Sequence, residues 1–112
     1  MIFLFGPLYS GKRDYACQLL HCGREELPQY AVWDVQELAA QADDLETLAG
    51  RLCAYPVVIA TETGGGVVPA DPAQRAAREA AGRLNALLAR RADTVIRVFY
   101  GLPILLKGSL PQ

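Results

Sequence analysis

The chain has 112 residues, 52% of them hydrophobic, which is enough for one compact domain with a core and too short for two. A net charge of -1 excludes a field strong enough to draw the protein to nucleic acid or to an anionic membrane. The apolar start at residues 1–5 lacks a basic flank and ends at Gly6, unlike a signal peptide or a membrane span. We therefore expect one domain over residues 1–112, located in the cytoplasm.

The cysteines give no sign of a cross-linked or metal-bound scaffold. Cys17, Cys22 and Cys53 are odd in number and form no C-x-x-C pair. This pattern supports neither a disulfide framework nor a zinc site. We expect ordinary buried thiols.

Residues 6–13 match the phosphate-binding loop pattern G-x-x-x-x-G-K-[S/T] at every position except the last. In such a loop, backbone N–H groups and the following helix N-terminus surround the β-phosphate, while the lysine reaches the β- and γ-phosphates. We expect Gly6, Ser10, Gly11 and Lys12 to bind the phosphates of a nucleotide. Arg13 stands where a serine or threonine normally binds magnesium, and its guanidinium can partly neutralise a triphosphate but cannot coordinate a cation.

The predicted elements alternate between strands and helices along the chain. Apolar runs predict strands at residues 2–5, 30–33, 57–61 and 94–100, with a short edge strand or hairpin at 104–106. Helical spacing predicts helices over 12–21, over 35–54 with a break near 41–44, and from 72 to 91. The run at 57–61 is apolar throughout and is expected at the sheet centre. The alternation predicts an α/β, P-loop NTPase-like three-layer sandwich with a mainly parallel sheet of four to five strands.

Two carboxylates follow predicted strands, at the edge where parallel sheets bind ligands. Asp34, after the second strand, is either a carboxylate that holds magnesium through water or a helix N-cap. Glu62, after the run at 57–61, is either a base or metal-water ligand for an acceptor hydroxyl or one half of a structural salt bridge. Arg75 and Arg78 are the candidate partners for such a bridge.

Two longer segments resemble a known family. Residues 57–69, VVIATETGGGVVP, look like the family segment V-V-x-S/T-N-E-V-G-x-G-I/V-V-P, and residues 75–85, RAAREAAGRLN, look like R-x-x-R-D-x-x-G-x-x-N. Together with the phosphate loop, they make the chain similar, over residues 1–20 and 55–107, to the bifunctional adenosylcobinamide kinase / adenosylcobinamide-phosphate guanylyltransferase family of cobalamin biosynthesis. Because the match includes the glycine run, Gly64 and Gly66 are expected in a ligand-binding loop rather than a simple turn.

The resemblance implies a P-loop protein that transfers a phosphoryl group from GTP or ATP, with Mg2+, to a hydroxyl of a cobinamide-like small molecule. It implies phosphate binding for Lys12 and a place beside the active-site cleft for Glu62. The family's second activity, guanylyl transfer, passes through a histidine that has no counterpart, since His21 lies at a different position. We therefore expect kinase-type chemistry without guanylyl transfer.

One alternative belongs to another functional class. Pro7 replaces a family glycine, and Arg13 replaces the serine that binds magnesium, as in a relative that has lost metal chemistry. Such a relative would bind a nucleotide or a partner protein in a regulatory or assembly role. The apolar stretch at 102–110 also suggests a homo-oligomer.

Overall fold

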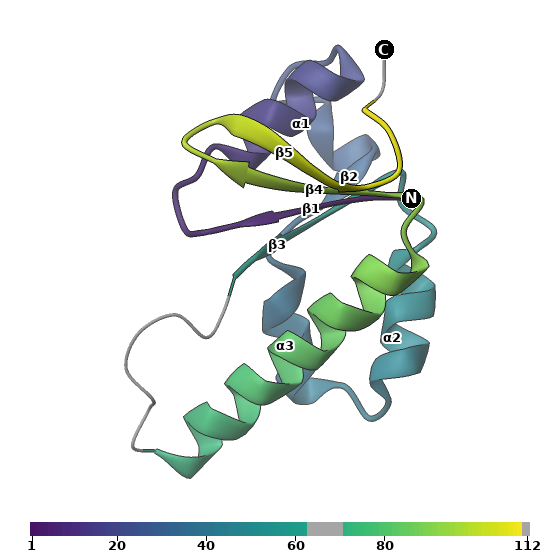
Figure 1. The fold of residues 1–112 in the computed structure, drawn as a ribbon. Coiled ribbons are helices and arrows are strands. Elements are labelled where there is room, and N and C mark those ends of the chain that lie inside the picture. The colour runs from purple at the N-terminus through teal and green to yellow at the C-terminus, as the bar shows by residue number, and fades with distance from the viewer. Residues whose placement is uncertain (63–70, 111–112) are drawn as a thin grey trace.

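The computed structural model describes residues 1–62 and 71–110, and these form one sheet covered by helices on both faces (Figure 1). The strands are β1 (Ile2–Gly6), β2 (Ala31–Val32), β3 (Val57–Thr61), β4 (Thr94–Phe99) and β5 (Leu102–Lys107). The α-helices are α1 (Lys12–Leu20), α2 (Leu45–Leu52) and α3 (Pro72–Arg91), and two 3-10 helices are η1 (Leu27–Gln29) and η2 (Val35–Gln41).

The five strands lie in the order β2-β3-β1-β4-β5. The first four are parallel, and β5 returns antiparallel to β4 as a hairpin. The predicted fold class and strand number are confirmed. The expectation that residues 57–61 lie at the sheet centre is wrong: β1 is the middle strand, and β3 lies between β1 and β2. Both strands are interior and apolar, so composition could not rank them.

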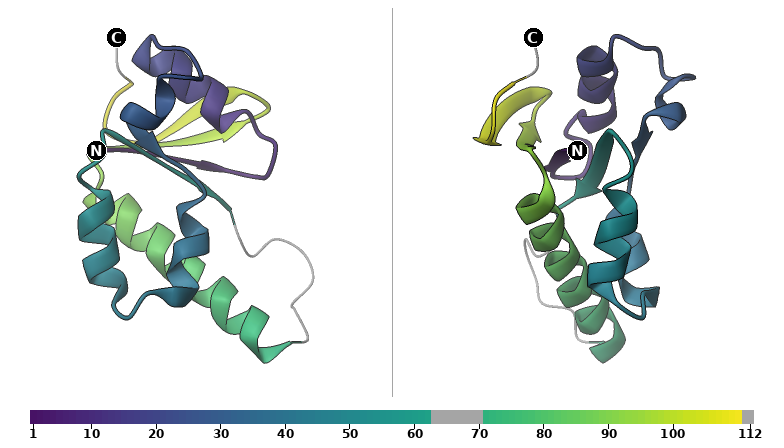
Figure 2. Two further views of the ribbon diagram at one scale, coloured as in Figure 1. Left: turned by 180° about the vertical axis from the view of Figure 1, so that it is seen from behind. Right: turned by 90° about the vertical axis from the view of Figure 1, so that its right-hand side faces the viewer.

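Two apolar clusters, one on each face of the sheet, produce the three layers (Figure 2). Successive strand residues point to opposite faces, so Phe3 joins the cluster under η2, α2 and α3, while Leu4 joins the cluster under α1 and η1. Both side chains are almost fully buried. We call these two sides the α3 face and the α1 face.

Local capping explains where two helices begin. Asp44 accepts hydrogen bonds from the Thr47 hydroxyl (2.6 Å) and the Glu46 backbone N–H (3.2 Å), so the predicted break in the 35–54 segment is confirmed. These bonds, the Thr47 hydroxyl first, lower the pKa of the Asp44 carboxyl. Asp71 caps α3 in the same way, through the Ala73 N–H at 2.9 Å. None of the helices in the described part of the chain is both long and apolar enough to cross a bilayer.

Candidate functional site

The phosphate-loop sequence forms the connection from β1 to α1, and its two glycines have structural reasons to be glycine. A Cβ at Gly6 would overlap the Val98 carbonyl oxygen and come within 2.9 Å of the Ser10 hydroxyl. Gly11 has φ 85°, a conformation that other residues rarely adopt, and a Cβ there would lie 3.3 Å from Gly101 Cα. The Gly101 N–H also donates to the Ser10 carbonyl at 2.8 Å, so the β4–β5 turn supports the loop.

Lys12 is buried, with 8% of its surface exposed, and its ammonium group points back into the loop. Nζ donates to the Pro7 carbonyl at 2.7 Å, the Gly6 carbonyl at 3.3 Å and the Ser10 hydroxyl at 3.5 Å. All three acceptors are neutral oxygens of the loop. A phosphate oxygen would be a stronger, charged acceptor for the same ammonium.

The charges around Lys12 come from the ends of three neighbouring strands. Burial lowers the pKa of the Lys12 ammonium, and nearby Arg13 lowers it further, whereas the carboxylates of Asp34 and Glu62 act in the opposite direction. These carboxylates follow β2 and β3, and the loop follows β1. The groups therefore interact at the edge of the sheet where the sequence predicted ligand binding.

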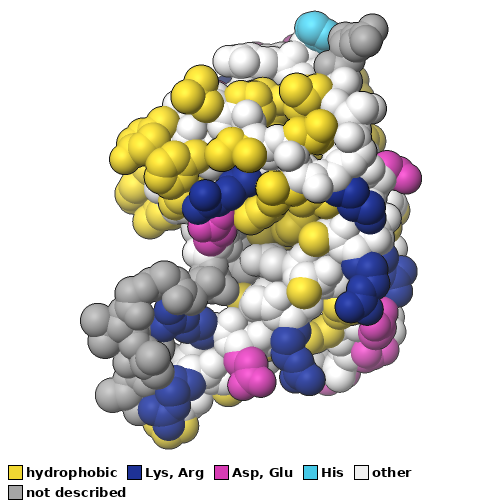
Figure 3. Space-filling model, in the orientation of Figure 1, with side chains coloured by type: hydrophobic (Ala, Val, Ile, Leu, Met, Phe, Trp, Pro, Cys, Tyr) yellow, Lys and Arg dark blue, Asp and Glu magenta, His cyan; other side chains and the backbone are white. Residues whose placement is uncertain are grey.

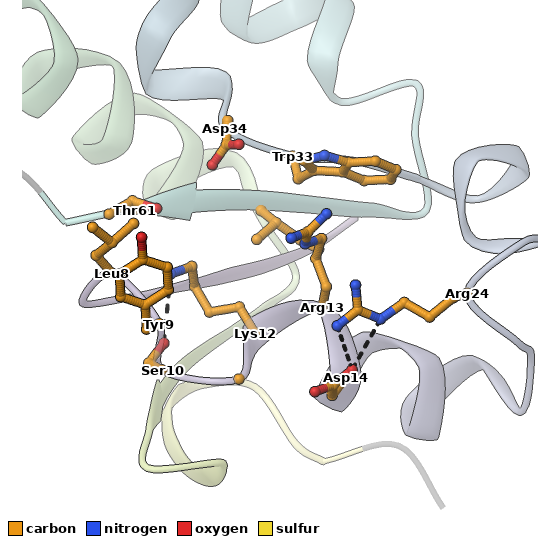
Figure 4. A pocket seen from close by; sticks show the side chains of 12 residues that line it. Leu8, Tyr9, Ser10, Lys12, Arg13, Asp14, Arg24, Trp33, Asp34 and Thr61 are labelled. Atoms are coloured by element: carbon orange, nitrogen blue, oxygen red, sulfur yellow. Dashed lines mark hydrogen bonds and ion pairs between the residues drawn. The ribbon is translucent and has the colours of Figure 1, made fainter.

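A cavity of about 480 Å³ opens beside the loop on the α1 face (Figure 4). Its volume lies in the range of small-molecule sites. It is bounded by the loop, the start of α1, the end of β2, the end of β3 and one side chain from the connection after α1. The lining residues are Leu8, Tyr9, Ser10, Gly11, Lys12, Arg13, Asp14, Arg24, Trp33, Asp34, Ile59 and Thr61.

Trp33 and Arg24 are among the lining residues that were not predicted. Trp33 packs against the α1-face cluster and also borders the cavity, with the Arg13 guanidinium 5.6 Å from its ring centroid. Arg24 lies beside Arg13 and is held by Asp14 through bonds of 2.6 and 3.0 Å (Figure 4). Trp33 could have been predicted at the cavity from its position next to Asp34. Arg24 follows α1 in an irregular segment, and no sequence pattern indicated that it would reach the cavity.

Asp34 borders the cavity and begins η2 with φ 55°. It occupies the N-cap position, yet its side chain accepts no capping hydrogen bond from the described residues. Across residues 1–62 and 71–110, no group of three or more His, Cys, Asp or Glu side chains could hold a metal ion. Magnesium is often bound by one or two carboxylates, with phosphates and waters completing its shell, and Asp34 fits that requirement. Arg13 has no acceptor atom to add.

Glu62 lies on the α3 face of the sheet, opposite the cavity. Its carboxylate accepts two hydrogen bonds from Arg97 of β4, at 2.5 and 3.1 Å, and within the described chain it is not among the residues that line the cavity. Arg97 is in register with Phe5, which packs on the α3 face. The structure thus shows an ion pair with Arg97, a partner that the sequence did not suggest. Gly64 and Gly66 lie outside the described residues.

The parallel sheet with its phosphate loop after the middle strand defines a P-loop NTPase-like fold. The family model of cobinamide kinase / cobinamide phosphate guanyltransferase matches residues 27–106. The chain belongs to this family. The matched segment begins after the phosphate loop, so the assignment of residues 6–13 rests on their pattern and geometry. It includes residues 27–54, which the sequence resemblance had left out.

One curated relative is the bifunctional adenosylcobalamin biosynthesis protein CobP of Pseudomonas aeruginosa. It is 35% identical over 76 residues, which cover 68% of this chain and 44% of CobP. The chain therefore matches less than half the length of that relative.

Proposed function

We propose that the protein binds GTP or ATP with the phosphates over the loop between β1 and α1, and transfers a phosphoryl group to a hydroxyl of a cobinamide-like small molecule. The observation that carries the proposal is the buried Lys12 ammonium, held at the loop by Gly6, Pro7 and Ser10 oxygens. Burying a cation costs free energy unless it has strong partners, and an anionic phosphate would be such a partner. Family membership supports the same kind of chemistry.

Each residue around the cavity has a distinct role in this proposal. Lys12 and the N-terminus of α1 neutralise the phosphates. Arg13 adds a second positive charge beside the cavity, and Asp34 is the residue that would hold magnesium through water. Magnesium, when bound, would neutralise part of the phosphate charge. Phosphoryl transfer depends largely on such positioning and charge stabilisation.

Glu62 is the residue that we propose orients the acceptor hydroxyl. In the structure both of its carboxylate oxygens are occupied by Arg97. Each oxygen keeps a second lone pair, so a hydroxyl could donate to Glu62 beside Arg97, although the paired guanidinium makes the carboxylate a weaker base. The exposed fraction of each side chain, 31% for Glu62 and 35% for Arg97, leaves the pair accessible to water and so to exchange.

The second candidate function is nucleotide or partner binding without catalysis. It is favoured by the occupation of Glu62 and by the arginine at the magnesium position of the loop. In this alternative, Arg13 takes over part of the charge neutralisation that magnesium would otherwise supply.

A direct assay separates the two candidates. The protein is incubated with cobinamide and GTP or ATP carrying a labelled γ-phosphate, with magnesium or with EDTA. Label on cobinamide that requires magnesium supports the kinase function. Nucleotide binding that is indifferent to magnesium, without transfer of label, supports the non-catalytic function.

We also propose that a second copy of the chain packs against β5. This edge strand is exposed along its whole length, and large apolar side chains cover the β4–β5 hairpin (Figure 3). The exposed apolar residues of this surface are Phe99, Tyr100, Leu102, Ile104, Leu105 and Leu106. An edge strand also offers backbone N–H and C=O groups to a like strand, which favours a symmetric pair of β5 strands.

A further inference from the structure

The C-terminal end of α1 brings two cysteines together. His21 has φ 52°, its N–H donates to the Gln18 carbonyl (3.3 Å), and the Cys22 N–H donates to the Cys17 carbonyl (3.1 Å). These two bonds define a Schellman motif at the end of the helix. The outer bond of this motif is the one between Cys22 and Cys17. Their side chains are the pair that normally makes a hydrophobic contact across this ending.

The two thiols are neighbours in the folded chain. Burial raises the pKa of the Cys22 thiol, and the nearby Cys17 raises it further. Both side chains are free, partly exposed, and packed at the rim of the α1-face cluster. They are held by backbone hydrogen bonds and apolar packing while remaining within reach of a small reagent.

Cys53 provides an internal comparison. It caps the end of α2, which packs on the other face of the sheet. It is also free and partly exposed. If the end of α1 makes its two cysteines reactive, Cys17 and Cys22 should react together and Cys53 should not react with them.

We propose that Cys17 and Cys22 form a redox-active dithiol that closes to an intramolecular disulfide by exchange with a low-molecular-weight disulfide of the glutathione type. One cysteine attacks the glutathione disulfide, forms a mixed disulfide and releases one glutathione. The other cysteine attacks the mixed disulfide, forms the Cys17–Cys22 bond and releases the second glutathione. Two protein thiols are oxidised, one external disulfide is reduced, and the two thiol protons end on the two glutathiones.

The location gives this modification a defined structural effect. The disulfide would fix the C-terminal end of the nine-residue helix α1, whose first two residues are Lys12 and Arg13 of the phosphate loop. Disulfides of this kind in the cytoplasm are generally transient or redox-sensing. The inference does not depend on the proposed nucleotide chemistry, because it rests on the helix ending alone.

The test is a redox titration of the full chain in buffers of reduced and oxidised glutathione, followed by alkylation and peptide mass spectrometry. We expect wild type and Cys53→Ser to lose two alkylatable thiols together and to yield a linked Cys17–Cys22 peptide. The effective concentration of one thiol toward the other should exceed the millimolar value of a short flexible segment by about tenfold or more. When the same protein is unfolded in urea, this effective concentration should fall to the millimolar value.

A second reagent tests the pairing without oxidation. Phenylarsine oxide bridges two adjacent thiols, so we expect it to bind wild type and Cys53→Ser, and to lose its tight binding with Cys17→Ser or Cys22→Ser. Circular dichroism checks that the serine variants keep their helices. The proposal is overturned if Cys17 and Cys22 form separate mixed disulfides with glutathione, or if folding does not raise their effective concentration.

Discussion

Glu62 and Arg97 form a two-point ion pair that crosses the middle strand of the sheet. Glu62 follows β3 and Arg97 lies in β4, while β1 runs between those two strands. The Glu62 N–H donates to the Gly6 carbonyl at 2.8 Å, which anchors the backbone of this carboxylate to the first residue of the phosphate loop. The Arg97 guanidinium also lies 5.0 Å from the ring centroid of Phe99. The pair therefore connects the loop, β3 and the β4–β5 hairpin.

Arg97→Gln is expected to affect stability more than nucleotide binding. The pair lies on the α3 face, whereas the cavity beside Lys12 lies on the α1 face, so nucleotide affinity should stay within about twofold of wild type. The thermal midpoint should fall, because a bidentate pair between strands is lost. Arg91→Gln, which breaks the more exposed pair with Glu46, is the matched control and should lower the midpoint less. A tenfold loss of affinity in Arg97→Gln would contradict the separation of this pair from the nucleotide site.

Arg13→Ser should increase the magnesium dependence of nucleotide binding. The change places a hydroxyl at the loop position that binds the ion in proteins with the complete pattern. Calorimetric titration of GTP or ATP is expected to show that magnesium improves the affinity of the variant by about fivefold or more, and that of wild type by less. Arg24→Ser is the control, since Arg24 also lines the cavity but lies outside the loop. Equal magnesium effects in wild type and Arg13→Ser would contradict this role for Arg13.

Two glycine substitutions should have opposite effects on stability. A Cβ at Gly6 meets the Val98 backbone, which cannot move aside like a flexible side chain, so Gly6→Ala should lower the free energy of unfolding by about 1–3 kcal/mol. Gly82 lies in α3 with nothing within 4 Å of the added Cβ, so Gly82→Ala should raise it by up to about 1 kcal/mol. Urea unfolding measures both. A neutral Gly6→Ala would mean that the loop is packed less tightly than the structure shows.

The exposed hairpin predicts self-association. Sedimentation velocity should show a dimer or larger species for wild type, and Leu102→Glu or Leu106→Glu should shift it toward monomer, because a charge would be buried in the contact. Leu38→Glu is the control: Leu38 is 44% exposed but lies in η2, away from β5. A monomeric wild type would contradict the pairing of β5 strands.

The parts of the fold that were predictable depend on local chemistry. Asp44 and Asp71 cap helices through bonds to residues two or three positions away, so short sequence patterns were sufficient to place these helix starts. The phosphate loop was predictable for the same reason. The steric limits that require glycine at positions 6 and 11 fall within one short contiguous motif.

The parts that were missed depend on sheet order. Arg97 is 35 residues from Glu62 in the sequence. The two side chains meet because β3 and β4 lie on either side of the same strand, β1. Composition could not choose between β1 and β3 as the middle strand for a related reason, since both are apolar and have neighbours on both sides. Asp34 was located at a strand end, but the cavity beside it also needed Arg24, whose position follows from an irregular connection.

The most direct test is a nucleotide titration that follows the fluorescence of Trp33, the single tryptophan of the chain, at the edge of the cavity. We predict a saturable change with GTP or ATP in wild type, and an affinity lower by about 10- to 100-fold in Lys12→Met, because a charged hydrogen bond to phosphate is removed. Lys107→Met, which removes the other lysine far along the chain, should bind like wild type. Equal affinity in Lys12→Met and wild type, or no saturable binding in wild type, would contradict nucleotide binding at this loop.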